Sequence, residues 1–131
     1  MKEYTESLID SLVAVFSENQ HVSIEKKITD FTLSSKKTIP VGIIINELLT
    51  NAFKYAFQGR DKGHISIELD SLDNQVCLTI QDDGVGMDKK VGANKLMGFG
   101  LTIVKMLAEQ LEGSFAIENE NGTKSVLKFR I

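Results

Sequence analysis

The chain has 131 residues, a length typical of one domain, since single hydrophobic cores usually comprise about 100–150 residues. Hydrophobic residues make up 42% and charged residues 25%, which excludes a disordered chain, and the lone Cys77 excludes a disulfide framework or a multi-cysteine zinc site. The net charge of −3 does not suggest the basic surface of a nucleic-acid-binding protein. The apolar run Val41–Ile45, like every other in the chain, is far shorter than the ~20 residues of a membrane span. We therefore expect one cytoplasmic domain over residues 1–131, with no nucleic-acid partner and no direct insertion into a membrane.

The first half of the chain contains two helical patterns with a strand pattern between them. Apolar residues at helical spacing predict a helix over residues 4–18. Alternating apolar residues then predict a strand over residues 22–28, with one irregular position at Lys26. Pro40 is predicted to begin a long helix over residues 41–57, because a residue in the first helical turn needs no amide hydrogen.

The second half contains four alternating segments that predict strands, at residues 65–69, 76–80, 115–117 and 127–131. They form two hairpins, with turns at Asp73-Asn74 and Asn121-Gly122. The irregular stretch Asp82–Gly100 separates the hairpins, together with an amphipathic helix that Gly113 ends. This order of elements predicts an α+β fold, a two-layer sandwich whose mixed, mostly antiparallel sheet carries helices on one face.

One face of the predicted long helix carries an acid, an amide and an amine. At about 100° per residue, Glu47, Asn51 and Lys54 fall within roughly 60° of one another. The pattern is either an ordinary solvated helix face or a metal site with oxygen ligands beside an anion site. In the second interpretation the Asn51 carbonyl oxygen suits Mg²⁺, which completes its shell with waters and phosphates, and Lys54 neutralises those phosphates.

Two glycine-containing segments follow. Asp82-Asp83-Gly84-Val85-Gly86 comes directly after a strand, and Gly98-Phe99-Gly100-Leu101-Thr102 leads into a helix. Each segment by itself is typical of an ordinary turn. In a binding site, however, a carboxylate at a strand end accepts a hydrogen bond from an exocyclic amino group and so selects adenine. Two glycines before a helix N-terminus leave backbone N–H groups free for a phosphate, and the three patterns together favour nucleotide binding.

With these patterns, essentially the whole chain resembles the ATP-binding catalytic domain of sensor histidine kinases, in the superfamily that includes gyrase, the ninety-kilodalton heat-shock chaperone and MutL. The resemblance implies a Bergerat-type ATP-binding fold, with ATP and Mg²⁺ as cofactors. The motifs that carry it are the N box Glu47-x-x-x-Asn51-Ala52-x-Lys54-Tyr55, the G1 box Asp82-x-Gly84-x-Gly86, the G2 box Gly98-x-Gly100-Leu101, and Gly122-Thr123 in the last hairpin.

The resemblance also implies a role for each matching residue. Glu47 stands where ATPases of the superfamily have a catalytic acid, and it would orient or deprotonate the nucleophile. The other implied contacts are Mg²⁺ at Asn51, phosphate at Lys54, the nucleotide border at Tyr55, the adenine amino group at Asp82, the pocket floor at Gly84 and Gly86, the phosphate end of the site at Gly98, Gly100 and Leu101, and adenine through water at Thr123.

The stretch Ile39–Phe57 most resembles the second histidine-kinase subclass, and within it the kinases that have a short ATP lid. Here eleven residues, Met87–Met97, separate the G1 and G2 boxes. The resemblance implies a histidine phosphoacceptor and dimerisation domain as partner, upstream or in trans, and a response regulator indirectly. Residues 1–18 are expected to continue from that missing domain, and the isolated domain is expected to be a monomer.

The implied function is to bind Mg·ATP and donate its γ-phosphate to a histidine on the partner domain. Neither His21 nor His64 matches the phosphoacceptor motif; both are expected to be solvated loop residues, so the chain alone is expected to be inactive. Two alternatives stay open. One is an anti-sigma-factor-type serine kinase, which the short length favours, and the other is a regulatory module that binds nucleotide without transferring phosphate.

Overall fold

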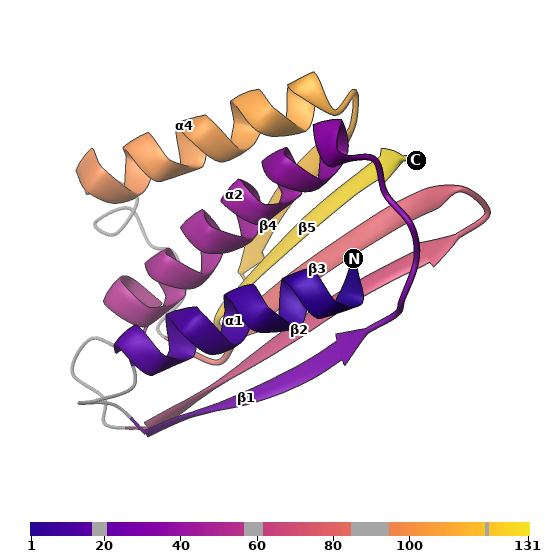
Figure 1. Cartoon of the computed structure of the whole chain (residues 1–131). Helices are drawn as coiled ribbons and strands as arrows, with labels where there is room; N and C mark the ends of the chain where they lie inside the picture. The colour runs from indigo at the N-terminus through magenta and orange to yellow at the C-terminus, as the bar shows by residue number, and fades with distance from the viewer. Residues whose placement is uncertain (17–20, 57–61, 85–94, 120) are drawn as a thin grey trace.

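The computed structural model describes residues 1–16, 21–56, 62–84, 95–119 and 121–131 (Figure 1). Its elements follow one another as α1 (Lys2–Phe16), β1 (His21–Ile28), α2 (Ser35–Asn51), the π-helical turn η2 (Ala52–Ala56), β2 (Lys62–Leu72), β3 (Gln75–Asp82), α4 (Lys95–Gln110), β4 (Ser114–Asn119) and β5 (Thr123–Arg130). The predicted order of helices and strands is confirmed.

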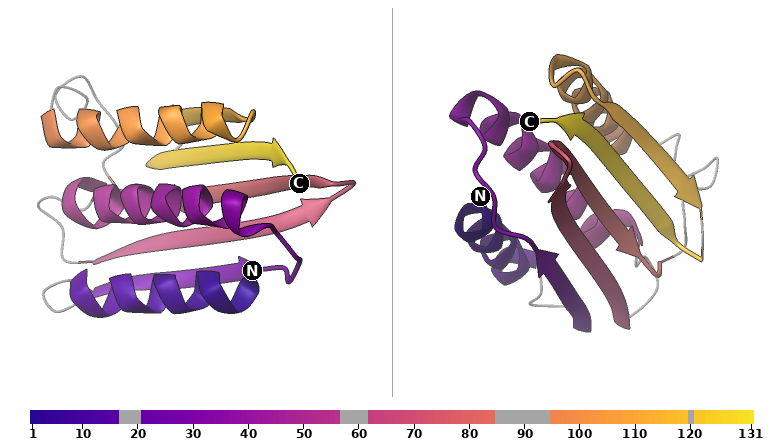
Figure 2. Two further views of the ribbon diagram at one scale, coloured as in Figure 1. Left: turned by 45° about the horizontal axis from the view of Figure 1, so that its top comes forward. Right: turned by 90° about the vertical axis from the view of Figure 1, so that its right-hand side faces the viewer.

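The five strands form one sheet in the order β1-β2-β3-β5-β4. β1 pairs with β2 in parallel, and the other three pairings are antiparallel. The helices lie side by side on one face of this sheet, with α2 between α1 and α4 (Figure 2). The predicted α+β sandwich with a mixed, mostly antiparallel sheet and helices on one face is therefore confirmed.

Both predicted hairpin turns form. Asp73 and Asn74 have φ angles of 53° and 63°, the left-handed pair that a two-residue type I′ turn requires. Asn121 and Gly122, between β4 and β5, also have positive φ angles, of 49° and 131°.

The hydrophobic core lies between the sheet and the helix layer. Alternate residues of β3 are buried, as expected for a strand that is covered on one face only. The side chains buried from both layers include Val41, Ile44, Ile45, Leu48, Leu49, Ile65, Ile67, Leu69, Leu78, Val104, Leu127 and Phe129. Each buried aliphatic or aromatic side chain contributes about 1.5–3 kcal/mol, so this layer contact accounts for most of the favourable free energy of folding.

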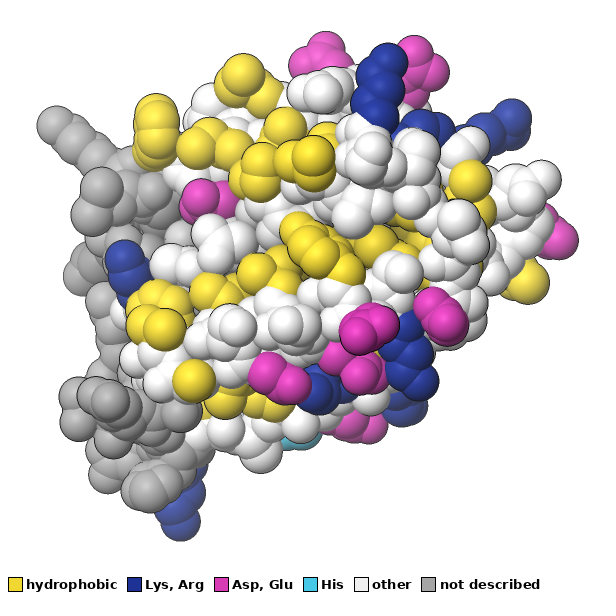
Figure 3. All heavy atoms as spheres, in the orientation of Figure 1, with side chains coloured by type: hydrophobic (Ala, Val, Ile, Leu, Met, Phe, Trp, Pro, Cys, Tyr) yellow, Lys and Arg dark blue, Asp and Glu magenta, His cyan; other side chains and the backbone are white. Residues whose placement is uncertain are grey.

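The outer side of the helix layer keeps some apolar side chains exposed, namely Ile39 and Ile43 on α2 and Phe99 and Met106 on α4 (Figure 3). Among the described residues, no helix is both long enough and apolar enough to cross a membrane.

Lys26 does not interrupt β1. The strand pairs with β2 in regular register from His21 to Ile28, and Lys26 faces the helix layer like its apolar neighbours. Its ammonium group reaches Asp10 of α1 at 2.8 Å, which explains how a charged residue occupies an inward position at the edge of the sheet.

The predicted start of the long helix was wrong. α2 begins at Ser35 rather than at Pro40, and Pro40 lies buried inside the helix. The Thr38 hydroxyl donates to the Ser34 carbonyl oxygen, and this bond supports the turn that precedes the proline. The end of α4 agrees with the expectation that Gly113 ends this helix: α4 ends at Gln110, Glu112 lies in the left-handed region at φ 55°, and the N–H of Gly113 donates to the Ala108 carbonyl oxygen in a Schellman-type cap.

Candidate nucleotide-binding site

The ends of several elements gather at one end of the molecule. The end of β3, the beginning of β5, the end of α2 and the beginning of α4 all lie at the left of Figure 1, and Figure 2 shows the same grouping. The three predicted boxes belong to these element ends. Residues far apart in the sequence are thereby brought to one region by the topology.

Asp82, at the end of β3, is the best-defined polar group of this region. Only 7% of its surface is exposed. Its Oδ1 accepts the Gly84 N–H at 2.9 Å and the Thr123 N–H at 3.2 Å. The carboxylate is therefore held by two backbone donors, one from its own loop and one from β5, as a group that recognises a ligand needs to be.

Glu47 and Asn51 face α4 from the neighbouring helix α2. A Cβ atom added to Gly100 of α4 would lie 2.8 Å from Glu47 Oε2 and 3.7 Å from Asn51 Nδ2. The absence of a side chain at Gly100 thus lets α4 approach both polar residues closely. Asn51 is 9% exposed, and among the described residues its Nδ2 has no hydrogen-bond partner. A buried amide without a partner requires an explanation, and a bound ligand is one.

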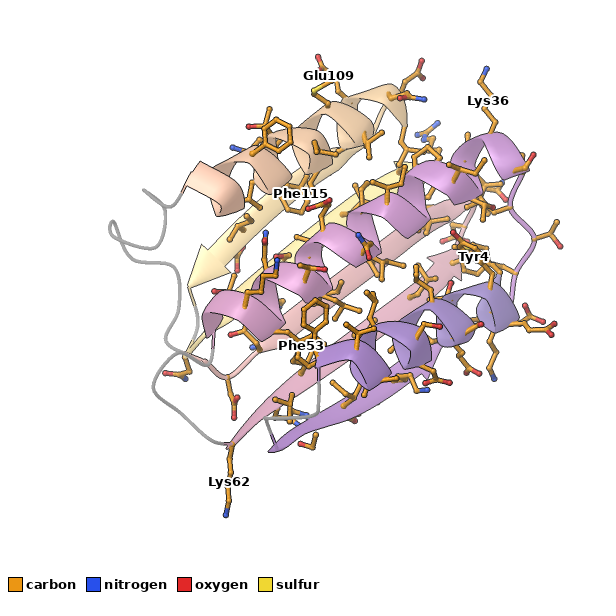
Figure 4. All side chains as sticks on the ribbon, turned by 60° about the vertical axis from the view of Figure 1, so that its left-hand side comes forward. Tyr4, Lys36, Phe53, Lys62, Glu109 and Phe115 are labelled. Atoms are coloured by element: carbon orange, nitrogen blue, oxygen red, sulfur yellow. The ribbon has the colours of Figure 1, made fainter. Side chains whose placement is uncertain are left out.

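The N box ends in a π-helical turn instead of a continued α-helix. η2 follows Asn51 directly, and π-helical turns inside helices are frequent at functional sites. Phe53 anchors the turn: it is buried, lies between α2 and α1 (Figure 4), and stacks on Phe16 with ring centroids 5.4 Å apart. Lys54 is exposed, and because the turn is π-helical, the 100° spacing that placed it on one face with Glu47 no longer applies.

The G2 box lies inside α4 rather than before it. The helix begins at Lys95, so Gly98 is its fourth residue and Gly100 its sixth. The free N–H groups of a helix belong to its first turn, so the expectation that both glycines precede the helix was wrong, while a phosphate contact of Gly98, Gly100 and Leu101 stays a prediction. Leu101 is 8% exposed and belongs to the hydrophobic core. Gly100 and Leu101 therefore serve helix packing here.

The remaining predicted site positions lie on several elements. Gly84 is half-buried and lies two residues after the end of β3, and Thr123 is the first residue of β5. The backbone of Tyr55 belongs to η2. Gly86 and most of the predicted lid lie outside the described residues.

His64 was expected in a loop, but β2 extends back to Lys62 and includes it. Its Nδ1 lies 2.7 Å from the Ser23 hydroxyl, and its Nε2 lies 3.5 Å from Glu25 Oε2. The backbone N–H of His64 donates to Asp83 Oδ1 at 2.8 Å. Asp83 thus ties the end of β3 to β2. Asp82 points to the opposite face of the sheet, as the alternation of side chains along a strand predicts for neighbouring residues.

The residues of this site fit a bound Mg²⁺. Among the described residues no group of three or more His, Cys, Asp or Glu side chains could hold a metal ion. Mg²⁺ bound with a nucleotide typically takes one or two protein ligands and completes its shell with waters and phosphate oxygens. The buried Asn51 amide suits that arrangement, because it combines an oxygen for the cation with a nitrogen that no described residue pairs and that can donate to a phosphate oxygen.

Comparison with known proteins identifies the family. Residues 36–131 match the sequence profile of the histidine kinase-, DNA gyrase B-, and HSP90-like ATPases, and the chain belongs to this family. It is a histidine kinase-like ATPase catalytic domain. The histidine kinase domain of a blue-light-activated kinase from Erythrobacter litoralis has the same fold, with a TM-score of 0.88 over 98% of this chain and 60% of that chain, at 18% sequence identity.

The similar curated proteins include sensor kinases and an anti-sigma factor. The chain is 37% identical over 79 residues to the sensor histidine kinase ComP of Bacillus subtilis, a match that spans 60% of this chain and 10% of ComP. It is 29% identical over 94 residues to the anti-sigma F factor of Clostridium beijerinckii, which spans 64% of both proteins. The chain thus covers less than two thirds of either relative.

Proposed function

We propose that this chain is the ATP-binding catalytic domain of a two-component sensor histidine kinase of the second, short-lidded subclass. It binds Mg·ATP and donates the γ-phosphate to a histidine on a separate phosphoacceptor and dimerisation domain, which in turn supplies a response regulator. The observation that carries the proposal is the buried Asn51 amide, which faces α4 beside Glu47 and whose nitrogen has no hydrogen-bond partner in the part of the chain that the structure describes.

Each of these side chains has a proposed role. Asp82 accepts a hydrogen bond from the adenine amino group, Asn51 holds Mg²⁺, and Lys54 contacts phosphate. Bound Mg²⁺ supplies positive charge that neutralises the phosphate oxygens. Glu47 orients or deprotonates the attacking histidine. Phosphoryl transfer is mostly positioning and charge stabilisation, so we expect this domain to be inert until an acceptor is supplied.

The remaining positions border the nucleotide. We propose that Tyr55 lies against it, that Gly84 and Gly86 form the pocket floor, that Gly98 lies near the phosphates, and that Thr123 contacts adenine through water.

Titration with a non-hydrolysable ATP analogue, with and without Mg²⁺, tests the proposal. Wild type is expected to bind more tightly with Mg²⁺. Asn51→Ala is expected to lose this Mg²⁺-dependent gain and to keep the weaker binding that the adenine contacts provide. Asn46→Ala is the matched control, because this residue lies on the same helix about 140° away from Asn51. An unchanged Mg²⁺ effect in Asn51→Ala would contradict the assignment of Asn51. If wild type binds no nucleotide in either condition, only a module that binds a protein partner would remain.

The second candidate is an anti-sigma-factor-type serine kinase, favoured by the similarity to the Clostridium anti-sigma F factor over 64% of each protein. The stability of the phosphorylated acceptor separates the two functions, because phosphohistidine is labile in acid and phosphoserine is not. An acid-stable product, formed by wild type and lost in Asn51→Ala, would establish the serine kinase instead.

A further inference from the structure

The turn between β4 and β5 packs directly against the end of β3. Gly122 is buried in this turn with a φ angle of 131°, a conformation that L-residues rarely adopt. A Cβ atom added there would overlap the Asp82 carbonyl oxygen, and it would lie 2.8 Å from the Asp82 carbonyl carbon and 3.0 Å from Asp83 Cα. These neighbours are main-chain atoms in a paired strand, so they cannot move aside as a flexible side chain would.

The residue after this glycine holds the Asp82 side chain. The Thr123 N–H donates to Asp82 Oδ1 at 3.2 Å across 41 positions of sequence, and the Gly84 N–H donates to the same oxygen at 2.9 Å. The distance between the turn and the strand end therefore decides whether the carboxylate keeps its second donor. Since Gly122 is the contact between the two backbones, its lack of a side chain sets that distance.

We propose that Gly122 is a positioning residue for purine selectivity: by packing the β4–β5 turn on the end of β3, it places the Thr123 amide so that the Asp82 carboxylate is aimed at the 6-amino group of adenine. The inference rests on the proposed nucleotide function. It assigns to the turn a main-chain role in choosing the base. The phosphate end of the site does not depend on this contact.

Gly122→Ala tests the proposal because it perturbs the contact in two ways, through the overlap and through the φ angle. The turn moves off β3, the Thr123 amide withdraws from Asp82, and the carboxylate loses its fixed direction. We expect the preference for ATP over ITP, which carries a carbonyl at position 6, to fall by about tenfold, as for the loss of one hydrogen bond to a charged group. Binding of inorganic tripolyphosphate should stay at the wild-type value.

Gly113→Ala is the matched control. Its Cβ would overlap the Lys128 carbonyl oxygen and lie 2.8 Å from Phe129 Cβ, so it also collides with a strand backbone, but at the opposite end of β5. It should lower stability without changing the ATP-to-ITP ratio. If Gly122→Ala fails to fold, a main-chain ester at Thr123 removes only the N–H, and it should also reduce the ratio.

Calorimetric titration of the full chain with ATP, ITP and tripolyphosphate measures the ATP-to-ITP affinity ratio and the tripolyphosphate affinity of each variant. A wild-type ratio in folded Gly122→Ala, or in the Thr123 ester, would overturn the inference. So would an equal loss of the ratio in Gly113→Ala. Failure of wild type to bind ATP at all would instead refute the proposed function, and with it the basis of this inference.

Discussion

Gly100→Ala should raise the stability of the free protein and weaken its binding of Mg·ATP. Gly100 lies inside α4, where alanine is favoured over glycine by about 0.5–1 kcal/mol. The new methyl group would lie 2.8 Å from Glu47 Oε2, the far end of a flexible side chain that can move by a few tenths of an ångström at small cost. Its contacts with the Asn51 amide, at 3.7 and 3.8 Å, are ordinary van der Waals contacts.

The melting temperature should therefore rise by roughly 2–4 °C for a domain of this size. The same methyl group displaces the Glu47 carboxylate and covers the amide that we assign to Mg²⁺. The partial loss of one polar contact costs about 1–1.5 kcal/mol, which corresponds to an affinity for Mg·ATP about tenfold lower. Stability and binding should thus change in opposite directions.

Thermal unfolding and calorimetric titration measure the two quantities. Gly42→Ala is the control, because it is also a helix glycine whose added Cβ would meet the end of a flexible side chain, the Tyr4 hydroxyl, away from the predicted boxes. It should leave the binding of Mg·ATP unchanged. A Gly100→Ala protein that is more stable but binds Mg·ATP as wild type does would refute the assignment of this helix contact to the site.

Three further changes test other parts of the structure. Asp82→Asn replaces an acceptor oxygen by a donor group, so binding of ATP should weaken by roughly tenfold or more while tripolyphosphate binding stays constant; equal losses for both ligands in titrations would speak against adenine recognition. Lys26→Met removes the ion pair with the 67% exposed Asp10, and urea unfolding should show a change below about 1 kcal/mol that shrinks further in high salt; a larger effect would mean the pair is more than a surface contact. Phe16→Ala removes the ring stacked on Phe53 and should lower stability by about 3 kcal/mol, with weaker Mg·ATP binding if η2 loosens; unchanged unfolding curves would show that this stack does not anchor the turn.

Local patterns were sufficient for most of the fold. The Asp73-Asn74 turn forms as predicted, because short polar side chains tolerate the positive φ angles of a type I′ turn. Alternation predicted the strands, since residues of one parity must face the helix layer. The boundaries were less certain, because burial of Pro40 and pairing of His64 with β1 extend α2 and β2 beyond their local signals.

The sequence by itself determined the element order, the fold class, the three boxes and the class of ligand they suggest, because each of these depends on residues a few positions apart. Only the tertiary structure decided how the boxes work together. It placed Gly100 inside a helix and against Glu47 and Asn51, where the sequence suggested a phosphate-binding turn. It also brought the Gly122 turn onto Asp82, 40 positions earlier in the chain. Such contacts depend on the distance at which two packed elements settle, and that distance is set by the whole core.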